Sequence, residues 1–257
     1  MAVDDLGVSV SPPHPVRRVV SLVPSLTETL ACERPGAVVG ATDWCTHPAD
    51  LSVTRVRGTK NPDVAAIVAL QPDLVVANRE ENRRVDVERL RAAGVPVWVT
   101  DIDSVGAALA SIERLFSDAL DWAPPTWLGQ ARQAWTAPPA QPGLRAAAAI
   151  WRDPWMVVGS PSFADDVLRL LGVDNPFRGR ADRYPRVTLD ELDTADLDLL
   201  ILPDEPYPFS ASDGPEALAG QATCLVSGRL LTWYGPSLES ARTELTRTIR
   251  SARIPNR

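Results

Sequence analysis

Two short polar loops at the ends of a compact apolar unit are the best candidates for chemistry in this chain of 257 residues. The first loop, 59–61, reads Thr-Lys-Asn, and the second, 78–82, reads Asn-Arg-Glu-Glu-Asn. Their hydroxyl, ammonium, amide and carboxylate groups can bind a ligand through hydrogen bonds and charge. The second loop directly follows an apolar run, and ligands of open α/β sheets bind at the carboxyl ends of strands. We therefore expect residues 57–82 to form one wall of a binding cleft.

Aromatic and charged residues stand at further predicted loop ends, both near the beginning of the chain and in its second half. Such rings bind a large, flat, partly apolar ligand at low entropic cost, and the carboxylates can accept hydrogen bonds from its amides or hydroxyls. The alternative is that the rings pack in the core and the charges are solvated. The candidate ligand-binding residues are Ser25, Trp44, His47, Thr59, Lys60, Asn61, Asn78, Glu80, Glu81, Asn82, Arg152, Trp155, Tyr184, Glu205, Tyr207 and Trp233.

Several other kinds of chemistry are disfavoured by what the sequence contains. There is no Gly-x-Ser-x-Gly motif, and His47 is the one credible general base for a serine hydrolase. The spacing Asp43-x-Cys45-x-His47 lacks a further metal ligand, and the three cysteines show no Cys-x-x-Cys pair. No glycine-rich phosphate loop is present. A net charge of −7 and a pI near 4.9 argue against nucleic acid as a partner.

The first residues predict neither a secretory leader nor an anchor. They contain acidic residues and no apolar stretch, and no lipobox cysteine follows. No run approaches the ~18 apolar residues that a membrane span requires. The sequence as written therefore predicts a cytoplasmic, monomeric protein without a membrane span, and an extracytoplasmic one only if translation starts upstream of Met1. Residues 1–16, which include Ser-Pro-Pro-His-Pro, are expected to be a flexible tail.

The first half of the chain alternates predicted strands and helices. Apolar runs predict strands at 18–23, 38–40, 74–77 and 95–99. A helix is expected to begin at the capping box Ser25-x-x-Glu28, and another at the N-cap Asn61, with further helices over 83–93, 104–120 and 126–135. The proline-rich stretch 137–143 predicts a connection between lobes.

The second half repeats this plan, although not its letters. Strands are expected at 146–151, 198–202 and 229–233, and helices at 160–171, after the capping box 188–191, and from 236 onward. The repeat predicts an α/β fold of two Rossmann-like βα lobes that face each other across a ligand cleft. The expected domain covers 17–252, with an N-lobe over 17–103, connecting helices over 104–143 and a C-lobe over 144–252.

Several motifs together resemble the periplasmic-binding-protein family of iron-chelate and cobalamin ABC importers, the class with a helical backbone between its lobes. They are Val-Val-Ser-Leu-Val-Pro-Ser-Leu-Thr-Glu at 19–28, Ile-Val-Ala-Leu-Gln-Pro-Asp-Leu-Val-Val at 67–76, Leu-x-x-x-Gly-Val-Pro-Val at 90–97, Tyr-Pro-x-Val-Thr at 184–188 and Trp-Tyr-Gly-Pro-Ser at 233–237. The resemblance implies two α/β lobes joined by a helix, ligand capture in the cleft between them, and no catalysis.

The resemblance also implies roles for individual residues. Trp44, Thr59, Asn78 and Tyr184 fall where the family's cobalamin binders contact the corrin with aromatic rings, and Trp44 and Tyr184 keep a ring. Importer binders present one glutamate from each lobe to arginines of the membrane permease. Those two positions hold Ala65 and Asp190 in this chain, so one docking charge is replaced.

Three functions follow as alternatives. The first is a solute-binding protein that captures a metal chelate, a cobalamin-like corrinoid before others, for ABC-type uptake, without a covalently bound cofactor. The second is an intracellular ligand-binding or sensor protein of the same fold without a transport role. The third is an enzyme on the same scaffold, with Asp204, Glu205 and the pair Glu80-Glu81 as acid–base groups.

Overall fold

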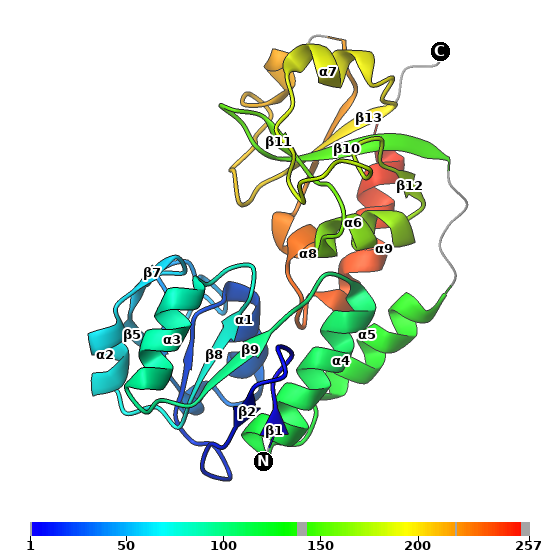
Figure 1. The fold of residues 1–257 in the computed structure, drawn as a ribbon. Helices are drawn as coiled ribbons and strands as arrows, with labels where there is room; N and C mark the ends of the chain where they lie inside the picture. The colour runs from blue at the N-terminus through cyan, green and yellow to red at the C-terminus, as the bar shows by residue number, and fades with distance from the viewer. Residues whose placement is uncertain (1, 138–142, 219, 253–257) are drawn as a thin grey trace. The chain divides into compact units, whose positions relative to one another are not determined.

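The chain divides into two compact units, each of which is described by itself. The computed structural model describes residues 2–137, 143–218 and 220–252, so most of the predicted connection over 137–143 lies outside the described residues. The N-terminal unit comprises Met1–Ile102, Gly106–Gln130 and Tyr234–Pro236, and the C-terminal unit comprises Asp103–Val105, Ala131–Trp233 and Ser237–Arg257. Figure 1 shows the fold, with each element labelled.

The N-terminal unit is built on a parallel sheet with the strand order β5-β4-β3-β8-β9. Every residue of the apolar run in β8 is buried, as expected of a strand covered on both faces. Figure 1 shows helices on both sides of this sheet. The strands are β3 (Val19–Ser21), β4 (Val38–Ala41), β5 (Thr54–Arg55), β8 (Leu74–Asn78) and β9 (Val97–Thr100), and the flanking helices are α1 (Pro24–Glu33), α2 (Val64–Ala69) and α3 (Arg84–Ala92).

Shorter elements and two longer helices complete this unit. A 3-10 turn, Pro35–Ala37, precedes β4, and β6 (Arg57–Gly58) pairs with β7 (Asn61–Pro62) in a small hairpin. Helix α4 (Val105–Arg114) continues into a π-helical segment, Leu115–Leu120. Helix α5 (Thr126–Thr136) begins in the N-terminal unit and ends in the C-terminal unit. Within the described part of the chain, no helix has the length and apolar character that crossing a membrane requires.

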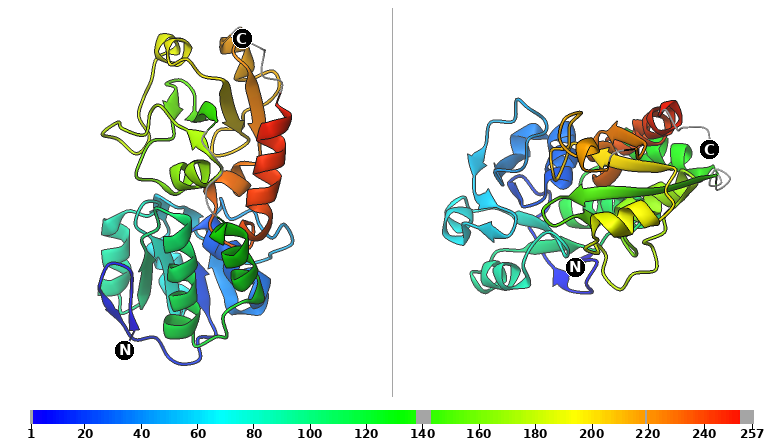
Figure 2. Two further views of the ribbon diagram at one scale, coloured as in Figure 1. Left: turned by 90° about the vertical axis from the view of Figure 1, so that its right-hand side faces the viewer. Right: turned by 90° about the horizontal axis from the view of Figure 1, so that it is seen from above.

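The C-terminal unit holds a second sheet, in which β10, β13 and β14 are parallel and β11 is an antiparallel edge strand. Alternate residues of β10 and β13 pack with Leu192 of α7 in one apolar cluster. Both views of Figure 2 show α9 alongside this sheet. The predicted α/β class is therefore confirmed. The elements are β10 (Leu144–Trp151), β11 (Met156–Val157), α6 (Phe163–Leu170), β12 (Val173–Asp174), α7 (Leu189–Thr194), β13 (Leu199–Pro203), the 3-10 turn Pro215–Ala217, β14 (Thr223–Val226), α8 (Gly228–Thr232) and α9 (Leu238–Ser251).

Of the helix starts predicted from capping residues, one is confirmed and two are wrong. Thr188 and Glu191 form the expected reciprocal capping box at α7. At α1, however, Pro24 is already helical, so Ser25 lies inside the first turn and makes no cap hydrogen bond. At α2 the N-cap is Asp63, whose carboxylate accepts from the Ala66 amide, because Asn61 is held in the β6–β7 hairpin.

The strand predicted over 229–233 is wrong as well. These residues form the short helix α8, and the edge of the sheet is β14, which precedes it. A short apolar run does not by itself distinguish a buried strand from a buried helix. The backbone here turns helical directly after β14, where the Gly228 amide donates to Asp204 Oδ1 at 2.7 Å.

The prediction of a flexible tail is wrong for the described residues 2–16. Strand β1 (Ala2–Val3) pairs with β2 (Ser9–Val10) in a hairpin whose turn is organised by two buried aspartates. Asp4 pairs with Arg91 of α3 at 2.9 Å, and Asp5 pairs with Arg114 of α4. The hairpin is therefore anchored to the body of the N-terminal unit by ion pairs, in addition to the buried side chain of Val10.

Candidate functional site

The loop after β8 is built around the buried amide of Asn78. Its Nδ2 donates to Thr100 Oγ1 at 3.0 Å, and its Oδ1 accepts from the backbone amides of Glu80 and Glu81 at 2.8 and 3.2 Å. Both ends of the amide group are thus used to shape the loop. Asn78 was predicted to contact ligand, and in this structure its side chain positions the two glutamates that follow.

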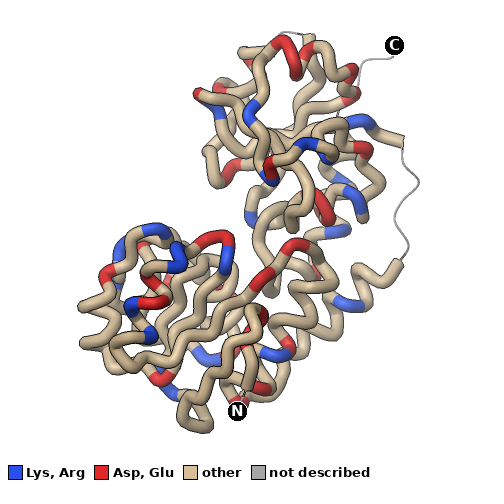
Figure 3. The backbone as a smooth tube through the Cα atoms, in the orientation of Figure 1, with Lys and Arg blue, Asp and Glu red and all other residues tan. Residues whose placement is uncertain are grey.

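The two predicted polar loops lie together in the structure. Asn82 Nδ2 donates to the carbonyl oxygen of Thr59 at 3.0 Å, and Lys60 Nζ donates to the carbonyl oxygen of Glu80. Asn82 Oδ1 also accepts from the Asn78 amide at 2.8 Å. Asn82 is therefore a buried link between the loops, while Lys60 and Asn61 remain exposed at the tip of the β6–β7 hairpin. Figure 3 shows basic and acidic positions interspersed in this unit.

Glu81 forms a hydrogen-bonded pair with Tyr234, a residue that the candidate set did not include. The Tyr234 hydroxyl donates to Glu81 Oε1 at 3.1 Å, and the hydroxyl of the predicted residue Ser25 interacts with it from α1. Burial, and then the charge of Glu81, raise the pKa of Tyr234 well above its usual value. The next residue, Gly235, approaches α1 so closely that a Cβ would lie 2.7 Å from Thr29 Oγ1.

Burial also raises the pKa of Glu81 from 4.5 to about 7, with Glu80 adding to the rise and Tyr234 and Lys60 opposing it. The folded protein therefore binds more protons than the unfolded chain between these values, so this group lowers stability as pH rises from 4.5 to about 7. Glu81→Gln keeps an acceptor for Tyr234 and removes the titration. We expect thermal unfolding midpoints between about pH 5 and pH 8 to fall more for the wild type than for the variant. Parallel curves would contradict the assignment.

Trp44 and His47 follow β4 in the same unit and are both exposed. Trp44 is 67% exposed, which is unusual for a tryptophan and leaves its ring available for stacking. Cys45 between them is buried, and its Sγ lies 3.0 Å from Thr27 Oγ1 and 3.1 Å from Thr42 Oγ1. Burial raises the pKa of this thiol. In the described part of the chain, no three His, Cys, Asp or Glu side chains gather as a metal site.

In the C-terminal unit, Arg152 organises a network at the carboxyl end of β10. It pairs with Asp213 and, at 2.6 Å, with Glu216, and the Tyr207 hydroxyl donates to Asp213 at 2.9 Å. These acceptors raise the already high pKa of Arg152, so the group stays charged. The half-buried Tyr207 ring lies edge-on to Trp151, with 5.5 Å between ring centroids, and Trp151 is 43% exposed.

Two other predicted aromatic ligands belong to the core of this unit. Trp155 is 6% exposed and stacks on Phe209 in the apolar cluster under the sheet, and Trp233 is 7% exposed. The alternative interpretation, in which such rings are packing residues, describes these two better. Glu205 lies after β13, partly buried, where its Cγ and backbone leave no room for a Cβ on Gly228.

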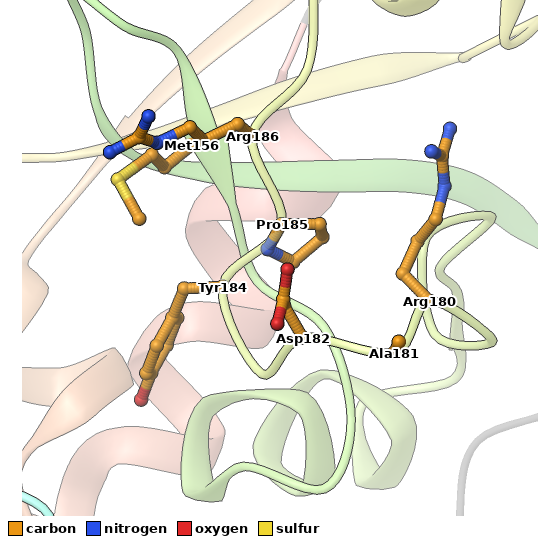
Figure 4. Close-up of a pocket in the computed structure, with 7 residues that line it drawn as sticks. All are labelled: Met156, Arg180, Ala181, Asp182, Tyr184, Pro185 and Arg186. Carbon is orange, nitrogen blue, oxygen red and sulfur yellow. The ribbon is translucent and has the colours of Figure 1, made fainter.

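Tyr184 lines a cavity of about 490 Å³ in the C-terminal unit, together with Met156, Arg180, Ala181, Asp182, Pro185 and Arg186 (Figure 4). This volume is within the range usual for ligand pockets. The figure shows Arg180 and Arg186 on either side of Pro185, with the Tyr184 ring extending away from both. Sequence reasoning found Tyr184 but not the arginines.

The two predicted permease-docking positions are both accessible. Ala65 is exposed on α2, and Asp190 is exposed in the first turn of α7. They are therefore available to a partner. Sequence reasoning missed Arg180 and Arg186, whose one signal was their position beside Tyr184. Trp151 and Tyr234 stand out as aromatic residues at predicted strand ends but were not among the candidates.

Comparison with known proteins identifies relatives of this chain, although no family model matches it. The vitamin B12-binding protein of Vibrio parahaemolyticus is 25% identical over 197 residues, which cover 73% of this chain and 70% of the relative. An uncharacterized ABC transporter substrate-binding lipoprotein, YvrC of Bacillus subtilis, is 34% identical over 103 residues, 38% of this chain and 33% of the relative. The solved structure of the periplasmic heme-binding protein BhuT matches with a TM-score of 0.75 and 25% identity, over 90% of this chain and 97% of that one.

These relatives contradict the prediction on localisation and agree with the prediction on catalysis. The prediction of a cytoplasmic protein is wrong, because the relatives are a lipoprotein and a periplasmic protein. That prediction depended on the first residues of the sequence, which contain no apolar stretch. The prediction of no catalysis agrees with them, since they are binding proteins and not enzymes. The chain is therefore similar, in sequence and in fold, to periplasmic-binding proteins of the iron-chelate and cobalamin class.

Proposed function

We propose that this protein captures a planar metal chelate for uptake by an ABC transporter, with a corrinoid as the first candidate and a haem as the second. The observation that carries the proposal is the exposed Trp44 ring, which follows β4 and lies close to Gly58, directly before the loop of residues 59–61. The relatives named for vitamin B12 and heme support the ligand class. They do not favour an intracellular sensor or an enzyme.

The proposed ligand contacts are those predicted side chains whose rings or polar groups remain accessible. In the N-terminal unit they are Trp44 and Lys60, with Glu80 presented by the Asn78 turn. In the C-terminal unit they are Tyr184 and Tyr207. We also propose that an ABC permease docks on α2 and α7, with Asp190 supplying the one acidic contact and Ala65 an apolar one.

A ligand panel tests the proposed function. Cyanocobalamin, dicyanocobinamide, hemin and a ferric siderophore are titrated into the protein, and quenching of its tryptophan fluorescence is followed, with calorimetry as the second method. We expect at least one tetrapyrrole to bind with a Kd below about 100 µM, equivalent to about −5.5 kcal/mol. If none binds at that level, chelate capture is not the function of this chain.

Replacing Trp44 by alanine is expected to weaken binding of the best ligand of that panel about tenfold. Loss of one stacked ring removes about 1–2 kcal/mol of contact energy, and an exposed ring contributes little to folding. The thermal unfolding midpoint therefore stays at the wild-type value. Trp98→Phe, in the buried strand β9, serves as the contrasting variant, because it changes stability without touching the ligand. Unchanged affinity for Trp44→Ala would remove this residue from the site.

A further inference from the structure

The cavity beside Tyr184 carries a concentration of positive charge that the proposed function does not use. Residues 178–186 read Arg-Gly-Arg-Ala-Asp-Arg-Tyr-Pro-Arg, four arginines and one aspartate, in a chain whose net charge is −7. Two of these arginines are paired with carboxylates, Arg178 with Asp165 at 2.9 Å and Arg180 with Glu191 at 2.7 Å. Arg180 and Arg186 line the cavity together with Asp182, and the exposed Arg186 guanidinium favours an anionic group there.

The wall of the cavity is held in one conformation by backbone contacts. The Gly159 amide donates to the Arg183 carbonyl at 2.8 Å, and the Val157 amide donates to the Pro185 carbonyl at 3.1 Å. A Cβ on Gly159 would lie 2.8 Å from the Asp182 carbonyl oxygen, so the two segments are in close contact. A site formed before the ligand arrives does not lose binding energy to ordering its own backbone.

The two arginines that line the cavity have different surroundings. Arg180 Nη2 donates to Glu191 Oε1 at 2.7 Å. This bond orients the guanidinium and uses one of its five N–H donors. Arg186 is exposed, and among the described residues no ion pair joins it to a carboxylate. A guanidinium binds a carboxylate or a phosphate through two parallel hydrogen bonds. It therefore selects anions with two suitably placed oxygens more strictly than a simple point charge does.

We propose that this cavity is a subsite for an anionic side group of the bound chelate, a phosphodiester or a carboxylate, with Arg186 as its main donor. The volume of about 490 Å³ accepts a side group, while the ring system of the chelate lies against Tyr184 at the edge. This inference depends on the proposed function and specifies its ligand further. Such a subsite is expected to bind cobalamin more tightly than cobinamide, which lacks the phosphodiester. It is likewise expected to bind hemin more tightly than its dimethyl ester, which lacks the charged carboxylates.

The test compares both ligand pairs on three proteins: wild type, Arg186→Gln and Arg247→Gln. Arg247 is an exposed arginine of α9 outside the cavity, so it controls for the loss of one surface charge. For whichever pair binds, we expect the member that carries the phosphodiester or the carboxylates to bind the wild type at least about tenfold more tightly than the member that lacks them, the amount that one charge-assisted hydrogen bond contributes. In Arg186→Gln this preference falls to about threefold or less, and in Arg247→Gln it is kept.

The outcomes separate this inference from the function on which it depends. A preference for cobalamin that Arg186→Gln removes identifies the phosphodiester as the bound group, and a preference for hemin that Arg186→Gln removes identifies the carboxylate. If both members of every binding pair have the same affinity for the wild type, the anion subsite is refuted and chelate capture stands. The subsite is also refuted if Arg186→Gln keeps the full preference. If no member of either pair binds, both proposals fail together.

Discussion

Replacing Asp4 by alanine is expected to lower the free energy of unfolding of the N-terminal unit by about 3 kcal/mol, a large effect for a position near the end of the chain. The Asp4 side chain is 0% exposed, and its carboxylate accepts from Arg91 Nη2 at 2.9 Å. It also accepts from the backbone amides of Leu6 at 3.0 Å and Val8 at 2.8 Å, which close the β1–β2 hairpin.

The size of this effect follows from what alanine leaves behind. Removal of the carboxylate leaves three backbone donors, the amides of Leu6, Val8 and Val99, and a partly buried guanidinium without this acceptor. Breaking a buried ion pair by removing one partner costs about 3–5 kcal/mol, and Arg91, whose side chain is 29% exposed, can recover part of this through water. We therefore expect the loss of unfolding free energy in Asp4→Ala to lie at the lower end of that range.

Urea unfolding, with the slope m compared between variants, measures the change. Asp50→Ala provides the matched control, because Asp50 is an exposed aspartate of the same unit, and its replacement is expected to stay within about 0.5 kcal/mol. A change in the midpoint at constant m shows a loss of native contacts. Equal midpoints for the two variants would mean that the hairpin does not contribute to the stability of the unit.

The contrast between the hairpin and the sheets shows which parts of the fold local sequence can predict. Strands β8 and β13 were predicted because a run of apolar residues is itself the cause of their burial. The capping box at Thr188 was also predicted, since its two partners lie three positions apart. Asp4 lies 87 positions from Arg91, and no local pattern gives such a pairing. Its polar neighbours and the prolines that follow are typical of a tail.

The sequence predicts where candidate site residues lie along the chain better than it predicts what each side chain contacts. Trp44 and the loop of residues 78–82 were chosen because each follows a predicted strand. In a parallel sheet the carboxyl ends of the strands meet at one edge, where ligands bind. The role of each side chain depends on its partners. Asn78 and Asn82 use their amides within the loops, and Tyr234 contacts Glu81 across 153 positions of sequence. These distant contacts could not be derived from spacing.

Replacing Gly159 by alanine is expected to destabilise the C-terminal unit by about 3 kcal/mol, the upper part of the range for overpacking. The added Cβ would lie 2.8 Å from the Asp182 carbonyl oxygen, 2.9 Å from Pro185 Cδ and 3.2 Å from the Arg183 carbonyl oxygen. Two of these neighbours are backbone atoms and the third is a proline ring, so none can rotate away. The segment that carries Tyr184 has to move.

Thermal unfolding measures this loss as a fall in midpoint of roughly 6–12 °C for a unit of this size. Gly179→Ala is the matched control, because a Cβ at Gly179 meets nothing within 4 Å, and its replacement is expected to be neutral or slightly stabilising. Ligand affinity is expected to fall in Gly159→Ala and not in Gly179→Ala, since Tyr184 and Arg186 are displaced only in the first. If Gly159→Ala unfolds at the wild-type temperature, the wall of the cavity is not rigid, and the close packing of residues 182–185 does not position the site.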